Sequence, residues 1–311
     1  MKYFYTLIAA ISLLFIVKKS DAQDLDPRVY ARIPVNMTVL IAGFGYSHGG
    51  VLTDPSVPIQ NLSATLEMPS FAVAHSFSLF GKTAQASAAL PFAWAQLSGT
   101  VSGADQSTSR TGLGDMRMKL SILLIGAPAA TRAEFAKARR KTVIGTSITV
   151  VAPTGQYYPE KLINLGTSRW SFKPEVALSQ PISDRWLFDL YAGLWLFTEN
   201  NSFYPGNSIR SQHPMGSFQT HISYNIQPLM WIAFDATFYT GGNTTVNGAE
   251  KSDRQANSRV GATIALPVGK RNSIKLAYSR GAIIRYGANF TTVSLGWQTS
   301  IFRQAQVPKN N

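Results

Sequence analysis

The chain has 311 residues, of which 45% are hydrophobic and only 14% are charged. A soluble globular chain carries about 25% charged residues, so this chain has few groups with which to solvate an exterior. Cysteine is absent, which excludes disulfides, thiolate metal sites and a catalytic cysteine. The length allows one large domain or two ordinary ones.

The N-terminus has the pattern of a secretory signal peptide. Lys2 precedes an apolar run, Phe4 to Val17, and the small residues of Ser20-Asp21-Ala22 follow it. A transmembrane anchor is the alternative, but the run is shorter than the roughly 20 residues that a bilayer-spanning helix needs. We therefore predict a signal peptide over residues 1–22, cleaved after Ala22.

The rest of the chain consists of about twelve segments in which apolar and polar side chains alternate, as they do across a β-strand. None contains the 18 or so consecutive apolar residues of a transmembrane helix. The segments are Met37–Ser47, Ser70–Phe80, Ala84–Leu97, Met116–Ile125, Thr142–Ala152, Arg169–Ser179, Arg185–Glu199, Phe218–Ile226, Met230–Tyr239, Asn257–Leu266, Ser273–Arg280 and Thr291–Phe302.

The two faces of these segments differ in a way that favours a membrane barrel over a soluble sandwich. In Arg185–Glu199, Trp186 and Leu190 belong to an unbroken apolar face, whereas Asp189 and Tyr191 point the other way. In Thr291–Phe302 the face opposite the apolar one carries Thr, Ser, Gly and Gln from Thr292 to Ser300. Such small side chains would solvate the outside of a soluble protein poorly, whereas they fit a water-filled or tightly packed lumen.

Long connections and tight turns alternate along the chain, which is typical of a transmembrane β-barrel with short periplasmic turns and longer extracellular loops. The long ones are His48–Leu62, Ser98–Asp115, Pro153–Ser168, Asn200–Pro214 and Thr240–Asn257. The connection Gly126–Lys141 departs from this pattern, and the helix formers between Ala129 and Arg140 predict a short basic helix at the periplasmic rim. Aromatic residues near segment ends predict two interfacial girdles, formed by Trp170, Trp186, Trp231, Tyr239 and Trp297.

The predicted fold is an all-β, transmembrane antiparallel up-and-down β-barrel of about twelve strands. Its domain order is a signal peptide (1–22), an outer-membrane β-barrel (23–302) and a C-terminal tail (303–311). Outer-membrane barrels usually end on an aromatic residue, whereas here Phe302 is followed by Arg303–Asn311. The tail leaves open whether Phe302 acts as the assembly signal.

Charged side chains on the polar faces are the candidate site residues. One hypothesis is a cross-strand ladder that rigidifies the wall, with Lys173 and Glu175 beside Asp189. The other is a constriction whose basic excess selects anionic solutes, because rings of charged side chains set pore selectivity. The candidates are Arg117, Lys119, Arg169, Lys173, Glu175, Asp189, Asp235, Arg259 and Lys275.

Catalysis and cofactor binding are disfavoured. His221 shares a polar face with Gln219, Ser223 and Asn225, but no Gly-x-Ser-x-Gly motif accompanies it, and a lumenal histidine is more often a hydrogen-bonded wall residue. Histidines and carboxylates do not cluster at metal-ligand spacing, so neither metal nor cofactor is predicted. The net charge of +13 is scattered along the chain, which argues against nucleic acid as a partner.

Three runs resemble the outer-membrane transporter family named for a meta-pathway of phenol degradation. They are Pro153-Thr154-Gly155-Gln156-Tyr157, Leu162-Ile163-Asn164-Leu165-Gly166 and Arg169-Trp170-Ser171-Phe172-Lys173-Pro174-Glu175. The resemblance implies a barrel that takes up aromatic or other hydrophobic compounds, with outer-membrane lipid, a small solute and the barrel-assembly machinery as partners. The alternative function is that of a structural or assembly barrel with a filled lumen. An outer-membrane hydrolase is a less favoured alternative. The oligomeric state stays open.

Overall fold

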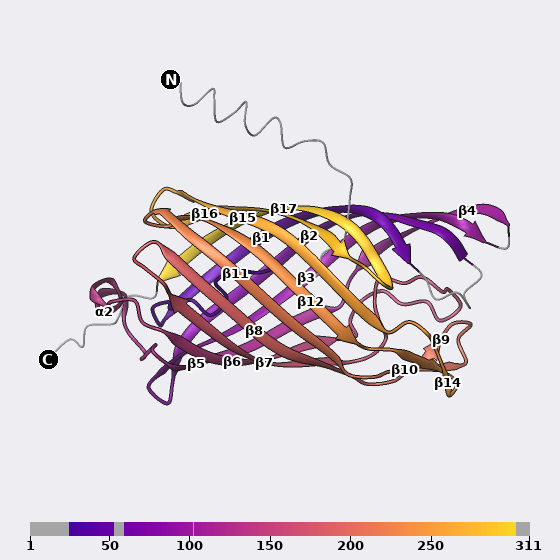
Figure 1. Ribbon diagram of the computed structural model, residues 1–311, viewed down its shortest axis with the longest axis horizontal. Helices are drawn as coiled ribbons and strands as arrows, with labels where there is room; N and C mark the ends of the chain where they lie inside the picture. Colours follow the sequence, from indigo (N-terminus) through magenta and orange to yellow (C-terminus); the bar gives the residue numbers. More distant parts are fainter. Residues whose placement is uncertain (1–24, 53–58, 102, 303–311) are drawn as a thin grey trace, which may run out of the picture.

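The computed structural model describes residues 25–52, 59–101 and 103–302. The signal peptide and the C-terminal tail lie outside this part of the chain, and both stay predictions. In the described residues, twelve antiparallel strands form a closed barrel (Figure 1), which confirms the predicted fold class and the twelve alternating segments. Strands β1 and β17 close the ring, pairing from Met37 opposite Phe302 to Leu52 opposite Gly287.

Each barrel strand pairs with the strands before and after it in the ring. The twelve strands are β1 (Met37–Leu52), β2 (Ile59–Leu79), β3 (Lys82–Val101), β5 (Met116–Ile125), β6 (Val143–Ala152), β7 (Ser171–Pro181), β8 (Trp186–Phe197), β11 (Met215–Gln227), β12 (Met230–Gly241), β15 (Gln255–Val268), β16 (Asn272–Ile283) and β17 (Gly287–Phe302).

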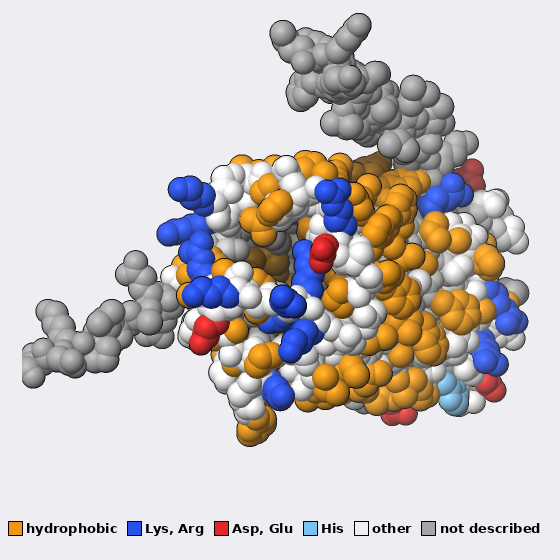
Figure 2. All heavy atoms as spheres, turned by 60° about the vertical axis from the view of Figure 1, so that its left-hand side comes forward, with side chains coloured by type: hydrophobic (Ala, Val, Ile, Leu, Met, Phe, Trp, Pro, Cys, Tyr) orange, Lys and Arg blue, Asp and Glu red, His pale blue; other side chains and the backbone are white. Residues whose placement is uncertain are grey.

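The barrel is apolar outside and polar inside. Phe71 and Phe234 on the outer wall are 57% and 63% exposed, whereas Asp189, His221 and Arg259 on the inner wall are 0% exposed. Figure 2 shows hydrophobic side chains covering the wall. This distribution is the reverse of that in a soluble protein, and it is stable when the outer wall contacts hydrocarbon. Because the ring is closed, each strand finds its backbone hydrogen-bond partners on its neighbours, which lipid cannot supply.

The two ends of the barrel differ. One, which we call the turn end, has the tight connections at residues 80–81, 182–185, 228–229 and 269–271. It lies at the left of Figure 1, beside helix α2 (Arg132–Lys137), and Lys and Arg gather around it in Figure 2. We call the opposite end the loop end. Since outer-membrane barrels have short periplasmic turns and longer extracellular loops, we expect the turn end to be periplasmic.

Helix α2 is shorter than the predicted stretch from Ala129 to Arg140. Thr131 begins it through a capping box with Glu134, and Ala138 is already extended. Hydrogen bonds from the backbone and hydroxyl of Thr131 lower the pKa of the Glu134 carboxyl. Among the described residues, no helix has the length and apolar character needed to cross a bilayer.

The long connections at the loop end contain strands that the sequence did not predict. Strand β4 (Ala104–Leu113) extends β3 as a hairpin, and its first six residues are all exposed. Without a buried face, such a strand has no apolar alternation to reveal it. The other loop strands form a second, four-stranded sheet: β9 (Asn200–Phe203), β10 (Ser208–Gln212), β13 (Thr244–Val246) and β14 (Ala249–Glu250).

The predicted aromatic girdles are correct in part. Trp170, Trp186 and Trp297 lie on the outer wall and are 42–44% exposed. Trp231 and Tyr239 were wrongly assigned, because their odd positions on β12 put them on the inner face with the buried Asp235. Their closeness to the strand ends was not enough to show which face they occupy.

Candidate functional site: the barrel lumen

Residues 25–36 precede β1 and lie within the lumen at the turn end; we call them the inner segment. On one side, the Asp26 carboxylate accepts a hydrogen bond of 2.7 Å from Lys275 Nζ on β16. On the other, the Tyr30 ring reaches β6 and β7. The inner segment therefore bridges strands five places apart in the ring of twelve, and it narrows the turn end.

Tyr30 is the most tightly held residue of the inner segment. Its side chain is 0% exposed, and its hydroxyl donates to Glu175 Oε1 at 2.8 Å and lies 2.7 Å from Ser147 Oγ. Burial, and then the Glu175 carboxylate, raise the pKa of the Tyr30 phenol, so the hydroxyl keeps its proton and remains a donor. Its ring also meets the Tyr191 ring edge-on, with centroids 5.0 Å apart.

A glycine on the barrel wall makes room for that ring. A Cβ at Gly145 on β6 would lie 2.8 Å from Tyr30 Cδ1 and 3.0 Å from Leu123 Cδ2. These distances are shorter than ordinary carbon contacts, so only glycine accommodates the observed position of Tyr30.

Arg28 fixes the middle of the inner segment. Its Nη1 donates to Asn225 Oδ1 at 2.9 Å, and its guanidinium lies 4.5 Å from the centre of the Trp231 ring. Burial lowers the pKa of Arg28 to about 10, which still leaves it cationic at neutral pH. Asp26, Arg28 and Tyr30 thus each hold the inner segment to the barrel wall through a polar side chain.

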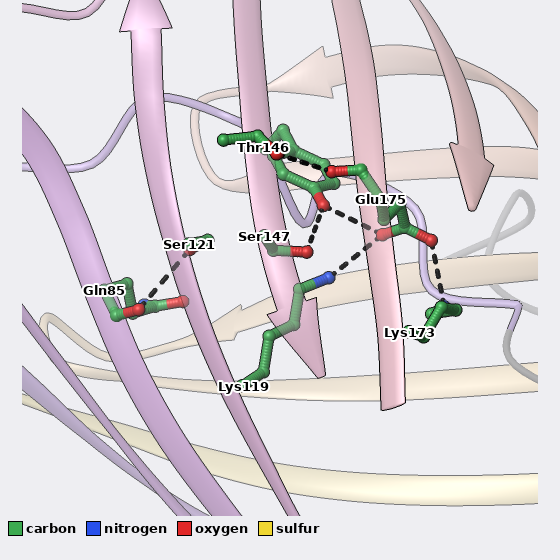
Figure 3. A network of polar contacts seen from close by, with 8 residues as sticks. Gln85, Lys119, Ser121, Thr146, Ser147, Lys173 and Glu175 are labelled. Atoms are coloured by element: carbon green, nitrogen blue, oxygen red, sulfur yellow. Dashed lines mark hydrogen bonds and ion pairs between the residues drawn. The ribbon is translucent and has the colours of Figure 1, made fainter. Parts of the chain in front are cut away.

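Glu175 is the centre of the network in Figure 3. Besides Tyr30, it pairs with Lys173 Nζ at 2.9 Å and with Lys119 Nζ at 3.2 Å. The cross-strand ladder predicted from the sequence included Asp189, and the position predicted for this residue beside Lys173 and Glu175 is wrong. In the register of β7 and β8, Asp189 is opposite Ser179, and Glu175 is opposite Gly193.

The other predicted charges form separate groups on the inner wall. Asp235 accepts from Thr263 at 2.8 Å and pairs with His221 Nδ1 at 2.7 Å. Arg259 donates to Ser279 Oγ at 3.1 Å and to the carbonyl of Phe290 at 3.2 Å. His221 is thus a hydrogen-bonded wall residue. Within the described residues, no group of His, Asp or Glu is arranged as a metal site.

Two aromatic rings occupy the lumen on the loop side of Tyr30; we call Trp195 and Phe197 of β8 the aromatic pair. The rings are nearly parallel, with centroids 6.4 Å apart and an interplanar angle of 11°. The sequence predicted neither as a site residue, because the candidates on the strand faces were the charged side chains. The inner-face alternation Asp189, Tyr191, Gly193 continues through both rings and was the available signal.

Three of the predicted cations lie over this aromatic pair. Lys173 Nζ is 5.3 Å and the Arg117 guanidinium 6.0 Å from the centre of the Trp195 ring. The Arg169 guanidinium is 4.4 Å from the centre of the Phe197 ring and also donates to Gln212. The nine predicted charges therefore all lie on the lumen side. Asp189 is buried on β8, and the other eight lie in the Glu175 network, beside the aromatic pair, against the inner segment, or on the wall of β12 and β15.

An apolar outer wall, a closed antiparallel ring and a polar lumen define a β-barrel of the outer-membrane type. The chain belongs to the family described as the MetA-pathway of phenol degradation, whose model matches residues 43–300. No curated protein matches the chain.

Solved structures show the same architecture. An outer membrane channel from Pseudomonas putida F1 is 18% identical, with a TM-score of 0.75 over 89% of this chain and 100% of that one. The transport unit of the autotransporter AIDA-I from Escherichia coli is 9% identical, with a TM-score of 0.53 over 96% of this chain and 97% of that one. At such identities the likeness establishes the fold.

Proposed function

We propose that the protein is an outer-membrane channel for the passive uptake of small aromatic or other hydrophobic compounds. The observation that carries the proposal is the aromatic pair, Trp195 and Phe197, whose rings lie among cations on the inner face of β8. Ring solutes stack on such surfaces, and the adjacent cations favour electron-rich rings. The family description, which refers to phenol degradation, supports this class of solute.

In this proposal the solute enters at the loop end and moves along the inner face of β8. It passes the aromatic pair and then meets Tyr191 and Tyr30, where the inner segment obstructs the turn end. Passage to the periplasm requires that the inner segment move. Delivery by a signal peptide and the assembly machinery to the outer membrane of a Gram-negative bacterium belongs to the same proposal.

A second candidate is a structural or assembly barrel with a filled lumen. The inner segment favours it, because the side chains of Asp26, Arg28 and Tyr30 hold that segment within the turn end. In this case the lumen charges serve the rigidity of the wall, and no solute passes.

Uptake of a small phenol into proteoliposomes separates these functions. We expect Trp195→Ala with Phe197→Ala to reduce the rate of uptake at least about threefold, since a lost stacking contact costs about 1 kcal/mol. Trp297→Ala on the outer wall is the matched control and should leave uptake unchanged. Equal uptake by both variants would refute the role of the aromatic pair, and a wild-type protein that admits no phenol would favour the filled barrel.

A further inference from the structure

A polar groove lies on the outside of the barrel, away from the lumen, at the loop end of β1 to β4. It encloses about 460 Å³. Paired residues of an antiparallel sheet share a face, and the registers place its side chains in two rows across neighbouring strands. The lower row is His48, Thr65, Gln96 and Ser109, and the upper row contains Ser63, Ser98 and Ser107.

The height of this outer groove relative to the membrane follows from the residues below it. The next row toward the turn end is Tyr46, Glu67 and Trp94, in which Tyr46 and Trp94 are 40% and 45% exposed. Exposed aromatic residues at the edge of an apolar wall mark the membrane interface. Two residues of an antiparallel strand rise about 7 Å along the strand, and barrel strands tilt by about 35–45°, so the outer groove begins about 5 Å above this interface.

The chemistry of the outer groove is that of a neutral hydroxyl-rich ligand. Hydroxyl, amide and imidazole groups both donate and accept hydrogen bonds, as sugar hydroxyls do. No lysine or arginine lines the groove, whereas a phosphate group would be held by cations. Two contacts orient the lining: Ser63 Oγ lies 2.9 Å from Ser98 Oγ, and His48 hydrogen-bonds Thr65.

We propose that the outer groove binds the sugar rings of a glycolipid headgroup in the outer leaflet. A glycolipid anchored in that leaflet presents its sugars just above the hydrocarbon boundary, at the height of the groove. The acyl chains then lie along the apolar wall below, where Phe71 and Leu90 are exposed. The proposal rests on the outer-membrane location but not on any transported solute.

Native mass spectrometry of the detergent-purified protein tests this with a neutral glycolipid, a diglucosyl diacylglycerol, whose headgroup carries no phosphate. In the variant Gln96→Ala/Ser98→Ala/Ser109→Ala, we expect binding to weaken at least about tenfold, because three hydrogen-bonding side chains are lost. All three positions are exposed, so folding should persist. A second variant, Ser109→Trp, fills the outer groove and should weaken binding equally.

Thr240→Val is the control, because it removes an outward hydroxyl near the loop end of β12, outside the outer groove. It should bind the neutral glycolipid like the wild type. Undiminished binding by both groove variants would overturn the proposal, as would equally tight binding of phosphatidylglycerol. If the soluble diglucoside without acyl chains bound equally tightly, the groove would take free sugars, and the assignment to a glycolipid would be wrong. Phenol uptake is measured separately, so failure there leaves this result intact.

Discussion

Replacing Tyr30 by phenylalanine removes one hydroxyl from the inner segment and nothing else. The ring can keep its edge-on contact with Tyr191 and its place beside Gly145. What is lost is the hydrogen bond to Glu175 Oε1 at 2.8 Å and the one shared with Ser147 at 2.7 Å. We expect the inner segment to leave the lumen more often in this variant.

The size of the effect follows from the two contacts. A hydrogen bond to a charged group contributes about 1.5–3 kcal/mol and a neutral one about 0.5–1.5 kcal/mol. Glu175 keeps both lysine partners, so the net loss is at the lower end, about 2 kcal/mol. That shifts the ratio of displaced to seated inner segment about 30-fold.

Single-channel recording in planar bilayers measures this ratio as the frequency of conductance openings. Tyr30→Phe should open about 30-fold more often than the wild type if displacement of the inner segment opens the lumen. Tyr46→Phe, on the outer wall, is the matched control and should not differ from wild type. An unchanged opening frequency in Tyr30→Phe would show that the Tyr30 hydroxyl does not hold the inner segment in place. If deletion of residues 25–34 then opened the channel, the inner segment would still be the obstruction, held by its other contacts.

Two further predictions concern the same region. Gly145→Val should displace the Tyr30 ring at a cost of about 1–3 kcal/mol and raise the opening frequency. Gly296→Val is the control, because a Cβ at that position has no neighbour nearer than 3.9 Å. Equal opening frequencies in the two variants would contradict the steric argument. Arg117→Gln with Lys119→Gln should reduce anion preference, read as a reversal potential closer to zero in a salt gradient. Cation preference in the wild type, or no change in the variant, would reject the anion constriction.

The fold was predictable because a barrel wall imposes two patterns on the sequence. Every wall residue faces either lipid or lumen, so alternation runs through each strand, as from Trp186 to Leu196. Tight turns and long loops fall at opposite ends, so the connections alternate as well. Strand β4 obeys neither pattern, because both of its faces are largely exposed.

The candidate site was predictable only where it belongs to the wall. Lys119, Lys173 and Glu175 were found because strand alternation places them inside. Tyr30 and Arg28 belong to an irregular segment with no period, and their partners are more than 100 residues away in the chain. Such long-range contacts leave no local signal, so only the three-dimensional structure reveals them.

The arrangement around Glu175 explains how the inner segment can be both firmly anchored and displaceable. A buried carboxylate that loses its single partner is destabilised by about 3–5 kcal/mol, which would make release of Tyr30 rare. Here Glu175 Oε1 also pairs with Lys119 Nζ at 3.2 Å, and Oε2 pairs with Lys173 Nζ at 2.9 Å. Loss of the tyrosine hydroxyl therefore leaves one lysine partner for each carboxylate oxygen. We expect the release of Tyr30 to cost less free energy than the loss of a single partner would.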